Sequence, residues 1–189
     1  GDKVLEKGTI IGPAEVAVLA AVGASKIEVS IRPVLEIAAT GSELVEPFQK
    51  PGVAKIRNSN SYQLLAQARR AGFDARYLGI AADSPEAIGS VIEESRERAD
   101  ILLLSGGVSM GEYDFVPEVL KKKGYRLLFE KVAIKPGKPT VFGVGGEGFV
   151  FGMPGNPVST FVVFELFVKP FCYALMGGHY RPIRVKAPL

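Results

Sequence analysis

The apolar positions of the chain fall into short runs that alternate with segments of helical spacing. Runs of apolar residues predict strands at 34–39, 74–80, 101–104, 140–144 and 149–151. Residues 126–134 are strand-like as well, and residues 26–31 alternate loosely, as a strand or a connector does. The wholly apolar run at 101–104 is typical of a parallel strand that is buried on both faces.

Helices are predicted between these strands. The segments with helical spacing are 13–22, 61–71, 85–98, 115–123 and 157–176. Pro13 stands in the first turn of its segment and Gly23 just beyond the end, as is usual for helices. Pro170 is expected to bend or split the last helix, because proline lacks the N–H that a helix interior uses. The alternation predicts an α/β fold of three layers, with a mostly parallel, doubly wound sheet.

Three glycine-bearing loops follow apolar runs, at Ser105–Asp114, Lys135–Pro139 and Gly152–Ser159. Glycines allow backbone N–H groups to approach a phosphate closely, and a helix N-terminus adds a favourable dipole. The alternative is that glycine and proline only form turns, and for one loop the two explanations are balanced. Three such loops, one of them with two lysines, favour a site for an extended anion.

These loops are expected to lie together. In a doubly wound sheet, ligands bind beyond the carboxyl ends of the strands. We therefore expect Thr40–Glu43, Gly106–Asp114, the Lys135 loop and Gly155–Ser159 to share one edge of the molecule.

Composition and charge narrow the classes of function. The chain has 189 residues, 47% hydrophobic and 23% charged, which is ordinary for a soluble protein with one α/β core and an appendage. The net charge of +3 is too small and dispersed for nucleic-acid binding, since the longest basic run is Lys121–Lys123. No charge-free apolar run reaches the ~18–20 residues of a membrane span. The start of the chain lacks the apolar region of a secretion signal, which predicts a cytoplasmic location.

The chain has one cysteine, Cys172, and one histidine, His179. A single thiol excludes an internal disulfide and fits a reducing cytosol, and its expected role is that of a small buried apolar residue. A single histidine argues against a Ser-His-Asp triad and against a histidine-based metal site. Chemistry is therefore expected from lysines, carboxylates and backbone groups.

Six segments occur in the order found in a known family: Thr40–Leu44, Arg57–Asn60, Asp83–Pro85, Ser105–Asp114, Ile134–Pro139 and Gly152–Ser159. Through them the chain resembles the molybdopterin-binding domain of MoeA-type molybdopterin molybdenumtransferases, which gephyrin-like proteins share. Residues 1–32 are similar to the tail of the preceding domain, and 178–189 to the linker that enters a C-terminal β-domain. The resemblance implies a molybdopterin-binding domain at 33–177 within a longer enzyme.

The resemblance assigns catalytic roles to Asp83, Asp114, Lys135 and Lys138. The two aspartate positions face the bound pterin nucleotide in related proteins, and paired carboxylates near phosphates suit Mg²⁺. Capping of the following helix is the alternative for each aspartate. Lys135 and Lys138 can receive a small tetrahedral oxyanion in a proline-stiffened loop, and the resemblance implies molybdate. The alternative for them is two surface lysines in an exposed turn.

Further residues are expected to bind the cofactor: Thr40, Gly41, Glu43, Asn60, Gly106, Gly107, Ser109, Pro139, Gly155, Asn156 and Ser159. Gly106 and Gly107 would let the backbone approach the ligand, and Ser159 resembles a further oxyanion contact. Asn156 is equally suited to stabilising its own turn. Ser42 stands where the family commonly has an acid, so that carboxylate is missing from this chain.

The implied function is a step of molybdenum cofactor biosynthesis. The domain would bind molybdopterin-AMP, molybdate and Mg²⁺, and would insert molybdenum as AMP leaves, by electrostatic positioning and without a protein nucleophile. Two alternatives stay open: adenylyl transfer to molybdopterin, as in MogA-type domains, against which the flanks argue, and a non-catalytic scaffold that serves oligomerisation. A homo-oligomer is expected, with no nucleic-acid or membrane partner. The isolated chain is expected to bind the nucleotide with little turnover.

Overall fold

The computed structural model describes residues 2–108, 115–146 and 148–178, together with 180, 182 and 185. The chain divides into two compact units. The larger unit is Pro33–Lys169, and the smaller one comprises Gly1–Arg32 and Pro170–Leu189. The loops singled out from the sequence all belong to the larger unit.

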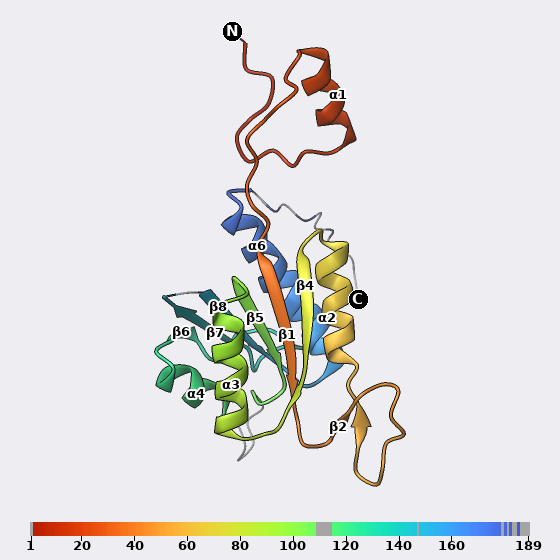
Figure 1. Cartoon of the computed structure of the whole chain (residues 1–189), viewed down its shortest axis with the longest axis vertical. Helices are drawn as coiled ribbons and strands as arrows, with labels where there is room; N and C mark the ends of the chain where they lie inside the picture. The colour runs from red at the N-terminus through yellow and green to blue at the C-terminus, as the bar shows by residue number, and fades with distance from the viewer. Residues whose placement is uncertain are drawn as a thin grey trace. The chain divides into compact units, whose positions relative to one another are not determined.

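Six strands of the larger unit form one sheet, in the order β4-β1-β5-β8-β7-β6 (Figure 1). Its strands are β1 (Val34–Thr40), β4 (Asp74–Ala81), β5 (Ile101–Ser105), β6 (Arg126–Phe129), β7 (Val141–Gly145) and β8 (Gly148–Met153). The strands β4, β1, β5 and β8 are parallel. β7 runs antiparallel to β8, and β6 antiparallel to β7. The prediction of a mostly parallel sheet is confirmed.

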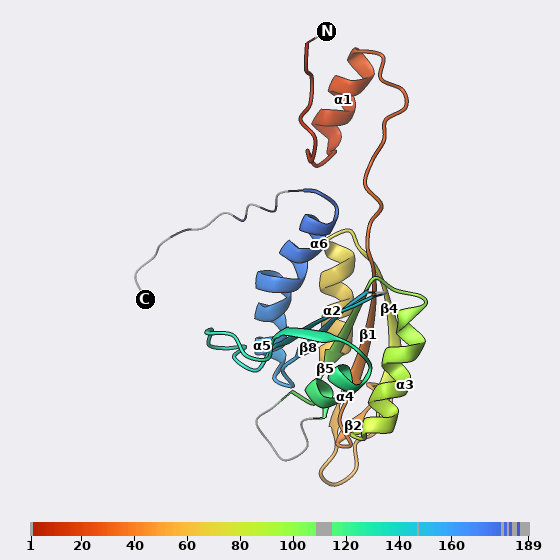
Figure 2. The same cartoon turned by 90° about the vertical axis from the view of Figure 1, so that its left-hand side faces the viewer.

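Helices cover both faces of this sheet (Figure 2). α2 (Asn60–Arg70) and α5 (Pro157–Val163) pack on one face, and α3 (Pro85–Arg96) and α4 (Val116–Lys122) on the other. Successive side chains of a strand point to opposite faces, so the buried central strand β1 contributes to both layers of the core. The expected three-layer α/β architecture is confirmed.

Local sequence signals explain where the helices begin. At the start of α3, Pro85 occupies the first turn and Ser84 Oγ accepts a hydrogen bond from Ala87 N at 3.2 Å. At the start of α4, Pro117 lies in the first turn, where its missing N–H has no helical partner to lose. The predicted helices therefore agree closely with those in the structure.

The strand predictions were less complete. Residues 126–134 are extended only in β6, because the chain then turns and Val132 N donates to Lys138 O at 2.9 Å. Residues 26–31 form a connector and no strand. A parallel pair of two-residue strands, β2 (Leu44–Val45) and β3 (Ile56–Arg57), was not predicted. Two residues are too few to give a periodic signal.

The long C-terminal helical stretch is interrupted ahead of its proline. A π-helical turn, η1 (Phe164–Val168), follows α5, and α6 (Lys169–Leu175) continues from it through Pro170. The expected irregularity is present, but it precedes Pro170 and is not a break. A π turn shifts the backbone hydrogen-bond register by one residue, which accommodates a proline without ending the helix.

By length and composition, the stretch Pro157–Leu175 would suffice to cross a membrane, with a mean hydropathy of 1.6. A helix that covers a core passes the same test. The middle of the stretch carries Glu165 and Lys169, which form an ion pair at 3.0 Å, while Val163 and Phe164 are fully buried. We therefore interpret its part within the larger unit, up to Lys169, as a covering helix of the sheet.

The smaller unit contains α1 (Pro13–Ala21). Gly12 N donates to Glu15 Oε2 at 2.9 Å, which satisfies a donor at the start of the helix. Elsewhere in the unit, Ser30 Oγ donates to Met176 O at 2.6 Å. No residue of α1 is buried, so its valines and leucine contribute to no closed core.

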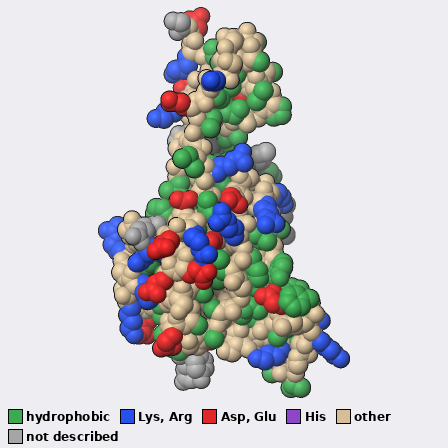
Figure 3. Space-filling model, in the orientation of Figure 1, with side chains coloured by type: hydrophobic (Ala, Val, Ile, Leu, Met, Phe, Trp, Pro, Cys, Tyr) green, Lys and Arg blue, Asp and Glu red, His purple; other side chains and the backbone are tan. Residues whose placement is uncertain are grey.

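Charges of both signs are mixed on the molecular face shown in Figure 3. Among the described residues, ion pairs between positions four apart include Glu94 with Arg98 and Glu118 with Lys122. The mixture leaves the face shown without a broad basic patch of the kind that attracts a polyanion.

Candidate functional site

The described loops meet at one edge of the sheet. Because β4, β1, β5 and β8 are parallel, their carboxyl ends meet there, and the antiparallel β7 places its amino end beside them. Backbone hydrogen bonds tie neighbouring loops together: Gly41 N donates to Ala81 O at 3.4 Å, and Gly106 N to Met153 O at 3.0 Å. The edge therefore brings together segments that are far apart in the sequence.

Thr40 ends β1 against two glycines of the next loop. Gly106 and Gly107 have φ values of +100° and +64°, which glycine adopts without strain. A Cβ on Gly106 would lie 2.2 Å from Thr40 O, and one on Gly107 would lie 2.9 Å from Thr40 Oγ1, so side chains are excluded there. Thr40 Oγ1 is buried without a hydrogen-bond partner among the described residues. An unpaired buried hydroxyl is costly, so Thr40 Oγ1 is a candidate for a further polar contact at this edge.

Two carboxylates flank the turn after β1. Asp83 Oδ2 accepts a hydrogen bond from Ser42 N at 3.1 Å. The Glu43 carboxylate folds over Gly41, with its oxygens 2.8 and 2.9 Å from where a Cβ on that glycine would lie. The cap of α3 is Ser84, so the capping alternative for Asp83 is wrong. The turn offers hard oxygen ligands of the type that Mg²⁺ prefers.

The lysine loop (Lys135–Pro139) is packed against the core at its centre. Gly137 is buried with a φ of +112°, and a Cβ there would lie 2.9 Å from Val163 Cγ2 of α5. Lys135 and Lys138, on either side of it, are exposed. The loop thus presents two ammonium groups from a backbone that the core holds in place.

The loop after β8 caps the helix that follows. Asn156 Oδ1 accepts hydrogen bonds from Val158 N at 3.0 Å and from Ser159 N at 3.2 Å. Asn156 therefore stabilises its own turn, and Ser159, 8% exposed, sits in the first turn of α5. Gly155 is exposed, while its carbonyl accepts a hydrogen bond from Asn60.

Asn60 joins three parts of the edge. Its Nδ2 donates to Gly155 O at 2.8 Å and to Ser105 Oγ at 2.9 Å, and it lies 3.4 Å from Thr160 Oγ1. Thr160 Oγ1 in turn donates to Pro154 O at 2.6 Å. Ser105 and Thr160 are not predicted as site residues, because their only signal in the sequence is a hydroxyl at a strand end or in a first helical turn.

A second network, which was also missed, ties the segment around β2 to α2 and β4. Glu46 accepts hydrogen bonds from Tyr77 Oη at 2.7 Å and from Tyr62 Oη at 2.9 Å. Asn58 Nδ2 donates to the same Tyr77 oxygen at 2.7 Å. Burial, and then the Glu46 carboxylate, raise the pKa of Tyr77 well above its ordinary value. The network anchors the chain just before Asn60.

Two of the predicted site residues, Ser109 and Asp114, lie outside the described residues. Within the described ranges, no group of three or more His, Cys, Asp and Glu side chains is placed to hold a metal ion. Asp83 and Glu43 are two carboxylates, which is in keeping with Mg²⁺, an ion that usually adds water and substrate phosphates to one or two protein ligands.

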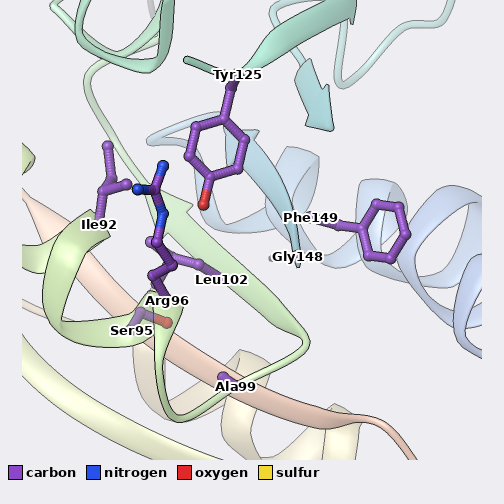
Figure 4. Close-up of a pocket in the computed structure, with 8 residues that line it drawn as sticks. All are labelled: Ile92, Ser95, Arg96, Ala99, Leu102, Tyr125, Gly148 and Phe149. Atoms are coloured by element: carbon purple, nitrogen blue, oxygen red, sulfur yellow. The ribbon is translucent and has the colours of Figure 1, made fainter. Parts of the chain in front are cut away.

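A small hollow lies at the opposite edge of the sheet, near the amino ends of β5 and β8 (Figure 4). Its lining comprises Ile92, Ser95, Arg96, Ala99, Leu102, Tyr125, Gly148 and Phe149. The Arg96 guanidinium lies 5.6 Å from the Tyr125 ring centroid and donates to Lys123 O at 2.8 Å. The Phe149 ring points away from the others. The arginine is thus engaged by its surroundings, and the hollow offers no comparable set of ligand-binding groups.

Comparisons with known proteins agree with this arrangement. Residues 36–174 match the family model described as "Probable molybdopterin binding domain". A molybdopterin molybdenumtransferase of Bacillus subtilis (strain 168) is 40% identical over 170 residues, which cover 90% of this chain and 40% of that protein. One of Staphylococcus aureus (strain Mu50) is 39% identical over 178 residues, 94% of this chain and 42% of that protein.

A solved structure shows the same fold. The crystal structure of a molybdopterin biosynthesis MoeA protein from Pyrococcus horikoshii has a TM-score of 0.78 at 30% identity, and the match covers 92% of this chain and 43% of that one. The chain spans about two fifths of the length of the curated relatives that it matches. Because the family model runs from β1 to α6, across every described loop of the edge, the chain belongs to the probable molybdopterin-binding domain family.

Proposed function

We propose that this domain acts in molybdenum cofactor biosynthesis: it binds molybdopterin-AMP and molybdate and assists the insertion of molybdenum as AMP leaves. The relatives named molybdopterin molybdenumtransferase are much longer than this chain, so the complete reaction is proposed for a larger enzyme. In that enzyme, residues 1–32 would be the tail of a preceding domain, and 178–189 would lead to a C-terminal domain. A cytoplasmic location fits the single buried thiol, Cys172.

The observation that carries the proposal is the meeting of two lysines, two carboxylates and a glycine-lined hydroxyl at one edge. Lys135 and Lys138 would hold molybdate, because ammonium groups donate several charge-assisted hydrogen bonds to a tetrahedral oxyanion. Thr40 Oγ1, buried and unpaired within the described chain, would bind a polar group of the pterin nucleotide. The backbone of Gly106 and Gly107 would lie close to that ligand.

Mg²⁺ fits the carboxylate side of this edge. Asp83 and Glu43 would hold it, and we propose that Asp114 joins them. When bound, the ion would neutralise phosphate charge. The chain's own part is to fix the positions of the two anions relative to each other, which lowers the entropy cost of bringing them together.

Substitution of the two lysines tests the oxyanion site. Lys135→Ala and Lys138→Ala should each weaken molybdate binding by roughly 10- to 100-fold, since hydrogen bonds from charged groups contribute ~1.5–3 kcal/mol. Both lysines are exposed, so thermal unfolding should not change. Calorimetric titration with molybdate measures the affinity, and Lys131→Ala, an exposed lysine of the preceding segment, is the matched control. Unchanged affinity in both loop variants would overturn the assignment.

The metal site is tested by removing one charge at a time. Asp83→Asn and Asp114→Asn should reduce the Mg²⁺-dependent part of AMP binding, while the melting temperature changes little. Titration with AMP in the presence of Mg²⁺ or of a chelator separates the two contributions. For Asp114, a lower melting temperature with an intact Mg²⁺ dependence would instead identify a helix cap.

Turnover distinguishes the proposed reaction from adenylyl transfer. The chain, which spans about two fifths of the length of these relatives, should bind molybdopterin-AMP and release little product. Consumption of ATP with formation of molybdopterin-AMP would instead identify an adenylyltransferase. Molybdenum insertion at the rate of a protein extended at both ends would show that the chain is complete in itself.

A further inference from the structure

We propose that Asn60 is a positioning residue that fixes the carboxyl end of β5 against the loop that follows β8, and that its amide N–H groups do not bind the ligand. The identity of the ligand rests on the function proposed above. The positioning role rests only on the described contacts.

The donors of the Asn60 amide are already used. The side chain is 8% exposed, and its Nδ2 lies 2.8 Å from Gly155 O, an atom that can only accept a hydrogen bond. This neighbour fixes which end of the amide is nitrogen. An NH₂ group has two protons, and they are shared among Gly155 O, Ser105 Oγ and, at 3.4 Å, Thr160 Oγ1, so the amide has none left to donate to a bound nucleotide.

The two acceptors belong to neighbouring segments of the edge, one at a strand end and one in a loop. Ser105 is the last residue of β5 and directly precedes Gly106, and Gly155 lies in the loop that leads into α5. The β5–β8 ladder ends at this level, where Gly106 N donates to Met153 O. Asn60 continues the connection beyond the ladder by a side chain, at the first residue of α2.

The side chain of Thr160 holds the same loop by a second set of hydrogen bonds. Thr160 Oγ1, fully buried, donates to Pro154 O at 2.6 Å and lies 3.0 Å from Asn156 O. Thr160 therefore holds the loop to α5, while Asn60 holds it to β5. Loss of the Asn60 amide would leave the hydrogen bonds of Thr160 intact and would free the loop only on the β5 side.

Hydrogen exchange on the ligand-free chain tests the positioning directly. Asn60→Asp keeps the shape but places an oxygen against Gly155 O, so the end of β5 and the loop after β8 should separate. The Gly106 amide should then exchange about 10-fold faster, while the Gly41 amide, bonded to Ala81 O, keeps its rate. Gln63→Ala is the matched control, since its side chain donates to Pro157 O from the same helix at a more exposed position. An unchanged Gly106 rate in Asn60→Asp and in Asn60→Ala would overturn the proposal.

A double-mutant cycle tests whether Asn60 acts through Ser105. AMP with Mg²⁺ is the probe, measured well below the melting temperature of each variant. If Asn60 acts through Ser105, Asn60→Ala should weaken binding about 10-fold alone but only about 2-fold in a Ser105→Ala background. An equal loss in both backgrounds would show that Asn60 does not act through Ser105 and would overturn the proposal. If the unsubstituted chain binds no AMP, the proposed function fails, and the exchange experiment alone decides the role of Asn60.

Discussion

At the scale of the residue, one carboxylate connects several elements near the site. Glu46 accepts hydrogen bonds from two tyrosine hydroxyls, Tyr62 and Tyr77, and it belongs to the segment that follows β2. Tyr77 also receives a hydrogen bond from Asn58, two residues before Asn60. The position of the α2 N-terminus, and with it the site edge, depends on this cluster.

The tyrosine cluster predicts an alkaline transition. Because the pKa of Tyr77 is raised in the folded chain, its contribution to stability is complete below about pH 10, the unfolded pKa, and is lost as the pH rises through the folded pKa. Absorbance titration of the phenolates should show both Tyr77 and Tyr62 ionising above a free tyrosine, because each donates to Glu46, and Tyr77→Phe should remove the Tyr77 step. In Glu46→Gln the pKa of Tyr77 should fall but stay above that of a free tyrosine, since burial of its side chain remains. Identical titrations of Glu46→Gln and the unsubstituted chain would contradict the assignment.

Residue types were easier to predict than their partners. Asp83 and Asn156 both precede a helix and both suit a cap, yet Asn156 is the cap of α5 while Asp83 stands one residue before the cap of α3. That one-residue difference turns the Asp83 carboxylate toward Ser42 N. Asn60 was expected to contact the ligand, and its partners, 45 and 95 residues away, have no local signal in the sequence.

At the scale of the element, long apolar runs and helix caps are sufficient to predict the main strands and helices. The strands of the buried sheet and the five helical segments follow from periodicity and from Gly and Pro at their ends. The exceptions are elements decided by tertiary contacts. β2 and β3 are too short to carry a pattern, and η1 reflects how the long helix accommodates Pro170.

Glu165 of the π-helical element η1 bonds Gln67 and Arg70 of α2, and this contact should weaken in acid. Burial alone would raise the pKa of Glu165, but hydrogen bonds from Lys169 and Gln67, with the charge of Arg70, lower it below its ordinary value. The stability that this carboxylate provides is therefore present above about pH 4.3, the unfolded pKa, and is lost as the pH falls through the folded pKa.

Glu165→Gln should lower the free energy of unfolding by about 1 kcal/mol at pH 7, with the difference shrinking below about pH 4. Denaturant unfolding at a series of pH values measures it. Glu118→Gln, which removes an exposed pair with Lys122, is the control and should have a smaller effect. A pH-independent difference for Glu165→Gln would show that the shape of the Glu165 side chain, and not its charge, stabilises the contact with α2.

At the scale of the molecule, the fold gathers its functional candidates on one edge and leaves one element without a core. No residue of α1 is buried, and Val16 is 56% exposed. A helix shorter than about 12–15 residues is marginal in water without tertiary packing. We therefore expect the amides of α1 to exchange far faster than those of α2, as followed by hydrogen exchange.

Protection of α1 equal to that of α2 would mean that another surface covers it. A second copy of the chain is the simplest such surface, and the protection should then fall when the protein is diluted. Protection that is independent of concentration would contradict both the exposed helix and the self-association.

The hydrogen bonds of Asn60 to Ser105, Gly155 and Thr160 also have a consequence for how the molecule folds. They join atoms of residues up to 100 positions apart, across parallel strands that must first be connected by their crossover helices. Contacts of such long sequence separation form slowly and late. An early intermediate with only β1, α2 and β4 in place would have no binding edge. A ligand of the complete edge should therefore slow unfolding and leave the refolding rate unchanged, because it meets its site only after the folding barrier has been crossed.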